Sequence, residues 1–176
     1  MDIYLDTLLN LPHVTVESCI RQDSEVVLKL CLLNHEASCP YCKQLTSEIN
    51  QTRYILVRDL SISGQATYLK LPRRQFYCRS CQQYFTESLS FVDEGRQYTK
   101  RYEEHIYQQV QSSSIQQVSR VEDISFERIE GIFKRQYAQK KTPNGQVLNG
   151  LELMRLANAK GSETLSQSSV ILKQGN

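Results

Sequence analysis

The chain has 176 residues, 40% of them hydrophobic and 23% charged, so it can fold as one ordinary domain or as two small modules. This composition excludes collagen-like, coiled-coil and strongly disordered proteins, and the lack of any run of about 18 apolar residues predicts no membrane span. The formal net charge of +2 is unevenly distributed: residues 1–52 carry three Lys or Arg against seven Asp or Glu, residues 53–82 six against one, and residues 95–141 nine against six. The two basic regions are compatible with a polyanionic partner.

The N-terminus, Met1 to Tyr4, is acidic and lacks the basic-then-apolar pattern of a secretory signal. We therefore expect a cytoplasmic protein. In that reducing compartment the six cysteines stay reduced, which favours metal ligands over disulfides for those that occur in pairs.

The first predicted elements are a short amphipathic helix over residues 3–9, ending before Pro12, and a β-hairpin over residues 14–32. Apolar residues alternate on both sides of a turn at Asp23 and Ser24. The hairpin also contains Cys19 and Cys31, which we interpret as small core residues.

Two further strands are predicted over residues 53–57 and 66–71, separated by a turn at residues 63–65. We expect Pro72 to end the second strand. Residues 73–77 then lead, in extended form, toward a pair of cysteines.

The pattern becomes helical after Gly95. Residues 98–111 place apolar side chains at a spacing of four, and the serines at 112–114 end that helix and can cap the next one. A short helix is predicted over residues 115–121. A final helix is predicted from the N-cap Ser125 to about Tyr137, with Ile129, Ile132 and Phe133 directed inward.

The strongest chemical signal is a pair of C-x-x-C units, formed by Cys39 and Cys42 and by Cys78 and Cys81. Two such units form the closed four-thiolate site that structural zinc prefers, so we expect one structural Zn²⁺ per chain. Unliganded buried cysteines and a redox pair are the alternatives; the latter needs a βαβ context that the pattern does not provide. His35 is an alternative ligand, although a surface position is expected for it.

Residues 115–134 fit a helix-turn-helix, with Ser119 where the helices cross and Asp123 at a turn that needs a left-handed residue. The second helix would be the recognition helix and would direct Arg128, Lys134 and Arg135 outward. Glu127 and Glu130 weaken the electrostatic case, so an ordinary helical hairpin remains the alternative.

Taken together, these features resemble the N-terminal half of the ISL-three family of bacterial insertion-sequence transposases. The matching stretches, in family order, are the sequence Cys-Pro-Tyr-Cys at 39–42, Val57 to Leu60, Arg73 to Cys81, and Phe85 to Glu87, followed by the helix-turn-helix. The resemblance covers about residues 1–140. It implies a zinc ribbon and a helix-turn-helix that bind the terminal inverted repeats of the element, and in family members an RNase-H-like domain with two-metal chemistry follows.

The fold class expected from this resemblance is α+β. A small β-rich zinc-ribbon domain over residues 1–95 precedes a helix-turn-helix domain over 96–140 and a poorly ordered linker and tail over 141–176. For contacts with double-stranded DNA we expect the basic residues Arg73, Arg74, Arg79, Arg128, Lys134 and Arg135. Candidate protein partners are a second copy of the chain or a full-length transposase.

The sequence departs from the family where the first catalytic aspartate is expected. No Asp follows Asp123, and the acids after the helix-turn-helix are Glu152 and Glu163. A nucleotide sequence that encodes Leu153 to Leu156 can also encode Asp-Glu-Ile when it is read in a shifted frame. The same shift, applied to codons for residues 168–172, can give Ile-Ser-Asp-Ile. We therefore hypothesise a frameshifted remnant after about residue 145, and a DNA-binding fragment that is not an enzyme.

Two other functions remain open at this stage. One is a free-standing transcription regulator, and the other is one part of a split or frameshift-expressed active transposase. The downstream nucleotide sequence would separate them.

Overall fold

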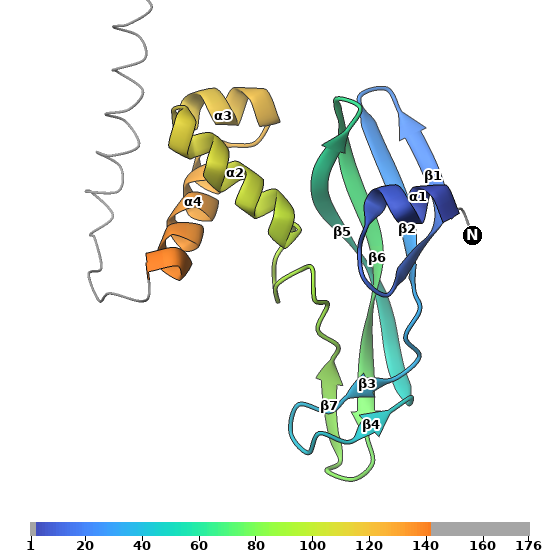
Figure 1. Ribbon diagram of the computed structural model, residues 1–176. Helices are drawn as coiled ribbons and strands as arrows, with labels where there is room; N and C mark the ends of the chain where they lie inside the picture. Colours follow the sequence, from blue (N-terminus) through green and yellow to red (C-terminus); the bar gives the residue numbers. More distant parts are fainter. Residues whose placement is uncertain (1–2, 142–176) are drawn as a thin grey trace, which may run out of the picture. The chain divides into compact units, whose positions relative to one another are not determined.

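The computed structural model of the chain describes residues 3–141. The chain folds as two compact units that meet in the sequence between Tyr102 and Glu103. The first unit is rich in strands and the second is helical, as expected for the α+β class (Figure 1). No helix within residues 3–141 is long and apolar enough to cross a membrane.

The first unit is built on a five-stranded sheet in the order β1-β2-β6-β5, with β7 pairing to β6 further along. The β2–β6 pair is parallel and the other pairs are antiparallel. A separate two-stranded sheet, β3–β4, belongs to the same unit. The strands are β1 (Val14–Gln22), β2 (Glu25–Leu32), β3 (Ala37–Ser38), β4 (Leu45–Thr46), β5 (Ile49–Ile62), β6 (Gln65–Cys78) and β7 (Gln83–Thr86).

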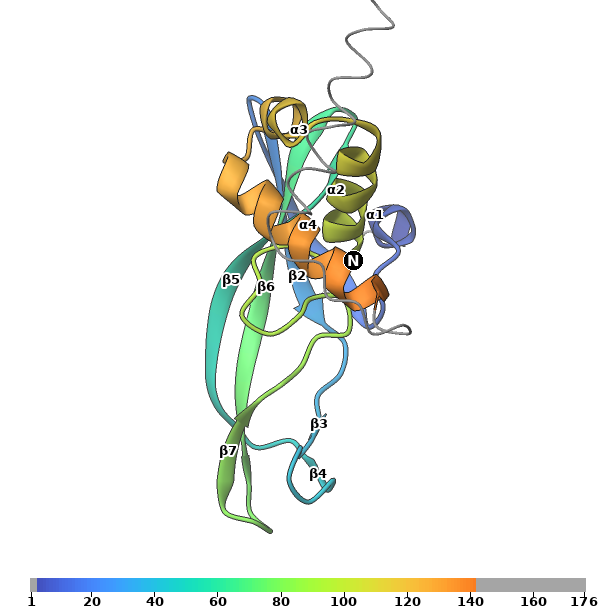
Figure 2. The same ribbon diagram turned by 90° about the vertical axis from the view of Figure 1, so that its left-hand side faces the viewer.

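Strands β5 and β6 form a long twisted ribbon that joins the two ends of this unit. The hairpin β1–β2 and helix α1 (Ile3–Leu9) lie toward one end, and β3, β4 and β7 lie at the other (Figures 1 and 2). The predicted helix over 3–9 and the hairpin over 14–32 are confirmed. Asp6 fixes the helix to β1, because its carboxylate accepts hydrogen bonds from Thr15 Oγ1 at 2.7 Å and from the Val16 backbone N–H at 2.6 Å.

The core of this unit lies on one face of the sheet. Alternate residues of the central strands are buried, because the side-chain period of a strand is two, and α1 and the segment after β7 add apolar side chains. The buried cluster contains Leu9, Val14, Val16, Val26, Leu28, Leu30, Leu32, Val57, Leu69, Leu71, Phe91 and Val92.

Pro72 does not end the second predicted strand, since β6 continues through it to Cys78. The missing N–H falls where no ladder bond is needed. On this side of β6, the pairing with β2 ends at Lys70 and the pairing with β7 begins at Gln75, so Pro72 lies in a gap between the two neighbouring strands. The next N–H on the same side, that of Arg74, donates to the Glu87 side chain. Proline is tolerated in a strand at such a gap.

The interpretation of Cys19 and Cys31 as core residues is wrong, because both are exposed. Cys31 lies between Leu30 and Leu32, which face the core, so the alternation places it on the opposite face. Cys19 lies in the part of β1 after the bulge at Val16/Ser18, and every residue there is exposed.

The second unit consists of packed helices: most of α2 (Lys100–Ser112), together with α3 (Ile115–Glu122) and α4 (Phe126–Lys141). The three predicted helices are confirmed, although α4 is one turn longer than expected. The apolar stripes of these helices pack together, and Ile106, Val110, Val118, Ile129 and Ile132 are all buried. Ser114 is the N-cap of α3, with its hydroxyl accepting from the Gln117 N–H at 3.2 Å.

Candidate metal centre and nucleic-acid interface

Two tight turns bring the four paired cysteines together. The first turn lies between β3 and β4, where the Lys43 N–H donates to the Cys39 carbonyl at 2.9 Å. The second follows the end of β6 at Cys78 and leads into β7. The residue after each C-x-x-C unit, Lys43 or Gln82, has a left-handed backbone, with φ of 64° and 55° respectively. Equivalent turns therefore present both pairs of thiols.

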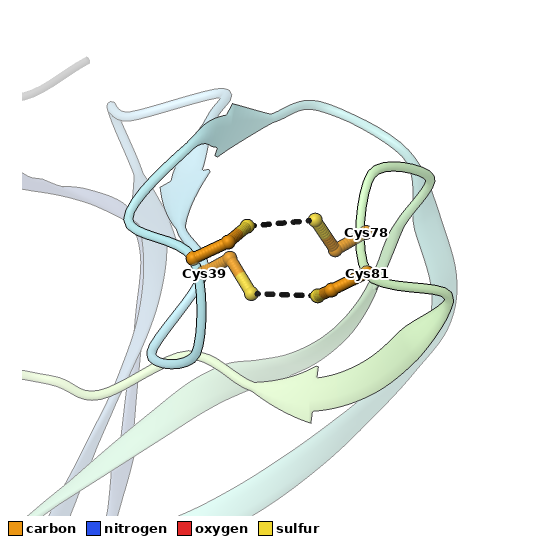
Figure 3. Close-up of side chains that lie close together, drawn as sticks. Cys39, Cys78 and Cys81 are labelled. Atoms are coloured by element: carbon orange, nitrogen blue, oxygen red, sulfur yellow. Dashed lines mark hydrogen bonds between the residues drawn. The ribbon is translucent and has the colours of Figure 1, made fainter.

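The four sulfurs lie at distances that suit a tetrahedral zinc ion. Cys39 Sγ is 3.5 Å from Cys81 Sγ, Cys42 Sγ is 3.5 Å from Cys78 Sγ, and all four lie within 4.8 Å of one another (Figure 3). A tetrahedron with zinc–sulfur bonds of about 2.3 Å has sulfur–sulfur edges of about 3.8 Å. The donor set and its spacing therefore fit one structural zinc, with all four positions taken by protein.

The surroundings of the four thiols lower the pKa of some and raise the pKa of others. Burial opposes the charged form of Cys39, but backbone N–H groups of Cys42 and Tyr41 hydrogen-bond its sulfur and lower its pKa to about 7. A hydrogen bond from the Cys81 backbone lowers the pKa of Cys78 in the same way. Burial raises the pKa of Cys81 to about 12, and the neighbouring Cys39 sulfur adds to this. Four thiolates at one point repel each other, so they need a bound cation.

An aromatic pair supports this centre from within the sheet. Phe76 and Phe85, with ring centroids 5.8 Å apart, form a buried cluster with Cys39 and Cys78. His35, the alternative ligand, is exposed and does not belong to the cysteine group.

The turn between α3 and α4 has the geometry of a helix-turn-helix. Asp123 adopts the left-handed conformation expected for the turn, with φ 51° and ψ 48°. Ser119 is more than a small residue at the crossing, because its hydroxyl donates to the Ile124 carbonyl across the turn at 2.6 Å. This hydrogen bond fixes the direction in which α4 leaves α3.

Comparison with known proteins gives the same two modules in the same order. A model of the zinc-finger of transposase IS204/IS1001/IS1096/IS1165 matches residues 35–81, and a model of the helix-turn-helix domain of transposase family ISL3 matches residues 87–137. The chain belongs to the ISL3 transposase family. It contains the zinc ribbon and helix-turn-helix of that family, which are DNA-binding modules.

A curated relative supports this assignment. The chain is 27% identical over 124 residues to the transposase for insertion sequence element IS1001 of Bordetella parapertussis. The match covers 70% of this chain but 30% of the relative, so the ISL3 similarity concerns a minor part of that longer protein. No solved structure matches the chain.

Of the basic residues predicted on the ISL3 zinc ribbon, Arg74 is not at the surface. Its guanidinium binds Glu87 through two hydrogen bonds of 2.8 and 2.6 Å and donates to the Asn34 carbonyl at 2.7 Å. It also lies over the Phe76 ring, 5.2 Å from the centroid. By contrast, Arg79 is exposed and pairs with Glu48 at 2.6 Å, and Arg73 is half-buried.

The predicted recognition helix also differs in part from the expectation. Arg128 is exposed near the start of α4, and Lys134 is partly exposed with an ion pair to Glu130 at 3.0 Å. Arg135 does not point outward: it forms an ion pair with the buried Glu103 of α2. Arg135 lies one turn after Ile132, at the flank of the buried stripe, so its long side chain reaches the helix that α4 packs against.

A third ionic contact to a buried carboxylate was also not predicted from the sequence. Asp59 is 1% exposed and accepts hydrogen bonds from Thr99 Oγ1 at 2.6 Å and Arg101 Nε at 2.8 Å. The same arginine donates to the Leu9 carbonyl at 2.7 Å. The only sequence signal was the place of Asp59 within the family stretch at residues 57–60. Glu152, Glu163 and the hypothesised frameshifted segment lie outside the described residues.

Proposed function

We propose that this chain binds duplex DNA at the terminal inverted repeats of an ISL3 element, using the zinc ribbon and the helix-turn-helix together. The observation that carries the proposal is the succession of both ISL3 modules in one chain, with a closed four-cysteine centre in the first. Zinc ribbons and helix-turn-helices each provide a rigid element that can enter or flank a groove of DNA. The ends of its own element are the DNA that a transposase of this kind must recognise.

In this proposal, zinc has a structural task. Bound by Cys39, Cys42, Cys78 and Cys81, it would join the β3–β4 turn to the ends of β6 and β7. It would then hold the exposed Arg79, which follows Cys78 directly, in a fixed place. No open coordination position remains for a water or a substrate.

Base recognition is assigned to the first turn of α4. In a helix-turn-helix the N-terminal residues of the second helix contact base edges. Arg128 occupies this region and is exposed, whereas Glu127 beside it would repel phosphate and so restricts the approach of the helix. Lys134, one to two turns later, would contact the DNA backbone once its partly buried ion pair with Glu130 opens.

The proposal assigns no strand cleavage to the described residues. Two-metal phosphoryl transfer needs carboxylates free to converge on ions about 3.5–4 Å apart. The acids Asp59 and Glu87 are both buried and held by arginines, so they serve the fold. A DNA ligand and a zinc site of reduced thiolates support a cytoplasmic location for the proposed activity.

The test is fluorescence anisotropy of the full chain with a labelled duplex carrying the element's ends and with a shuffled duplex of equal length. We expect preference for the ends, affinity that falls steeply with salt, and loss of binding after zinc chelation. Arg128→Gln should reduce the preference between sequences, and Arg120→Gln, which removes an exposed arginine of α3, is the matched control. Equal affinity for both duplexes would refute end recognition, and no binding to either would refute the function. Stronger binding to an intergenic promoter than to the ends would favour a transcription regulator.

Incubating the same complexes with magnesium or manganese tests the absence of cleavage. We expect the DNA to remain intact while binding is measurable in the same tube. Nicking at the element ends would overturn the non-enzymatic assignment. If Glu152→Gln then abolished this nicking, it would also overturn the frameshift hypothesis.

A further inference from the structure

Two arginines face each other across the β5–β6 ribbon. Arg53 of β5 is directly opposite Arg73 of β6 in the antiparallel register. Side chains at such positions share one face of the sheet, with Cβ atoms about 4.5–5.5 Å apart. Like charges at this spacing destabilise a sheet, so the pair opposes folding.

In the part of the chain that the structure describes, neither guanidinium has a carboxylate within ion-pair distance. Within residues 3–141, Arg53 and Arg73 form no ion pair, and Glu94, which lines a hollow of about 50 Å³ together with Arg73, is not within ion-pair distance of either. Neighbouring arginines of the same unit are paired, as Arg74 is to Glu87 and Arg79 to Glu48. Among the described residues, Arg53 and Arg73 are therefore two cations that face each other across the ladder without a carboxylate partner.

A second cross-strand pair of cations provides a comparison. Lys29 of β2 and Lys70 of β6 are also directly opposite. Here Glu17 binds Lys29 at 2.9 Å, and the Tyr54 ring lies 5.8 and 5.6 Å from the two ammonium groups. The fold thus compensates one like-charged pair and leaves the other open.

We propose that Arg53 and Arg73 together form a phosphate-binding element that contacts the backbone of duplex DNA. This inference rests on the proposed DNA-binding function and adds a contact surface on β5–β6 to the ribbon turns and helix α4. Arg53 is exposed, so its side chain is accessible to a ligand. Arg73 is half-buried, so its surroundings restrict the orientation of its side chain. A phosphate between two guanidinium groups removes the repulsion that the free protein tolerates.

The test compares Arg53→Gln, Arg73→Gln and Arg53→Glu in the full zinc-loaded chain. Arg21→Gln is the matched control, because Arg21 is an exposed arginine that faces Val26 rather than another cation. Thermal melting and anisotropy with a labelled mixed-sequence duplex are measured for each variant. The duplex titrations are repeated between about 50 mM and about 200 mM salt.

The salt exponent is the slope of log affinity against log salt concentration, and each lost phosphate contact should reduce its magnitude by about 0.9. Over that salt range, the variant should therefore lose about 3.5-fold less affinity than wild type. Arg53→Gln should bind more weakly than wild type without melting earlier. Arg53→Glu should melt later, because it forms a cross-strand ion pair with Arg73, and should bind more weakly still. Arg21→Gln should keep the wild-type exponent.

Two results would overturn the inference alone. A wild-type exponent in Arg53→Gln and Arg73→Gln would show that the pair does not contact DNA. A lower melting temperature in Arg53→Gln would show that Arg53 stabilises the fold. If the wild-type chain binds no duplex, the proposed function fails and this inference fails with it.

Discussion

Replacing Glu87 by Gln should destabilise the first unit strongly, although Glu87 makes no contact with zinc. Its side chain and that of Arg74 are 8% and 9% exposed, and the two are joined by a bidentate ion pair. The carboxylate also accepts the Arg74 backbone N–H at 3.0 Å. Glu87→Gln would leave a buried guanidinium without its counter-charge while nearly preserving the shape of the side chain.

Removing one partner of a buried ion pair costs about 3–5 kcal/mol, because the remaining charge stays desolvated. The glutamine oxygen can still accept one hydrogen bond from Arg74, so we expect a loss near the lower limit, about 3 kcal/mol. A change of 1 kcal/mol moves the melting temperature of a unit of this size by roughly 4–8 °C, which predicts a fall of at least about 12 °C. Thermal unfolding should be followed at one fixed zinc concentration, since bound metal shifts the midpoint.

Two controls separate burial from charge. Glu48→Gln breaks the Arg79 ion pair, which is at the surface, and should change the midpoint little. The double variant Arg74→Met with Glu87→Leu removes both buried charges and should recover most of the loss. If Glu87→Gln melts like Glu48→Gln, or if the double variant is worse than the single one, the assignment of Arg74 to the fold is refuted. Arg74 would then again be a candidate for DNA contact.

Three further outcomes are expected from the same structure. Cys39→Ser should abolish zinc binding and ordered folding of the ribbon, whereas Cys19→Ser should keep one zinc per chain by elemental analysis; retention of zinc by the first variant would contradict the site. Hydrogen bonds from a hydroxyl and an amide of β1 lower the pKa of Asp6, so its stabilising effect is present above the unfolded value of 3.8 and is lost as the pH falls through the folded value. Asp6→Asn should therefore be less stable than wild type at neutral pH and equal to it in strong acid, and a difference that does not depend on pH would be contrary evidence. Asp123→Gly should keep or raise the stability of the helical unit. Asp123→Val should lower it by about 1–3 kcal/mol, because a β-branched residue is strained at this positive φ. Urea unfolding of both variants would measure the difference.

The parts of this structure that were predictable are those set by local spacing. The four zinc ligands follow from two short C-x-x-C units, each of which can close a turn by itself. The turn at Asp123 and the cap at Ser114 follow from the backbone preferences of single residues. Such features need no knowledge of what packs against them.

Most of the mistaken features depend on neighbours far away in the sequence, and Cys31 is the exception. Whether Pro72 ends a strand depends on where β2 and β7 begin and end along β6. The exposure of Cys31 was already contained in its alternation with Leu30 and Leu32, but small size was given more weight than strand period.

Charge gave the least reliable prediction of position. Arg73 and Arg74 are adjacent and chemically identical, but their side chains lie on opposite faces of β6. Arg73 is half-buried, whereas Arg74 is buried and binds Glu87, 13 residues later. Arg135 is likewise held by Glu103, which belongs to another helix. A basic residue in the sequence does not reveal whether its carboxylate partner lies within reach in the fold.

The division of the zinc ligands between two turns has a consequence for the timing of synthesis. Cys42 leaves the ribosome 36 residues before Cys78, and the hairpin β5–β6 occupies most of that interval. At about 5–20 residues per second the first two thiols wait for about 2–7 s before the second pair is made. During this time an external oxidant that accepts two electrons and two protons can join one of them in a disulfide to the exposed Cys19 or Cys31 of the same nascent chain. A ribosome-arrested chain ending before Cys78 should therefore take up zinc only weakly and should be the species most easily captured by thiol reagents.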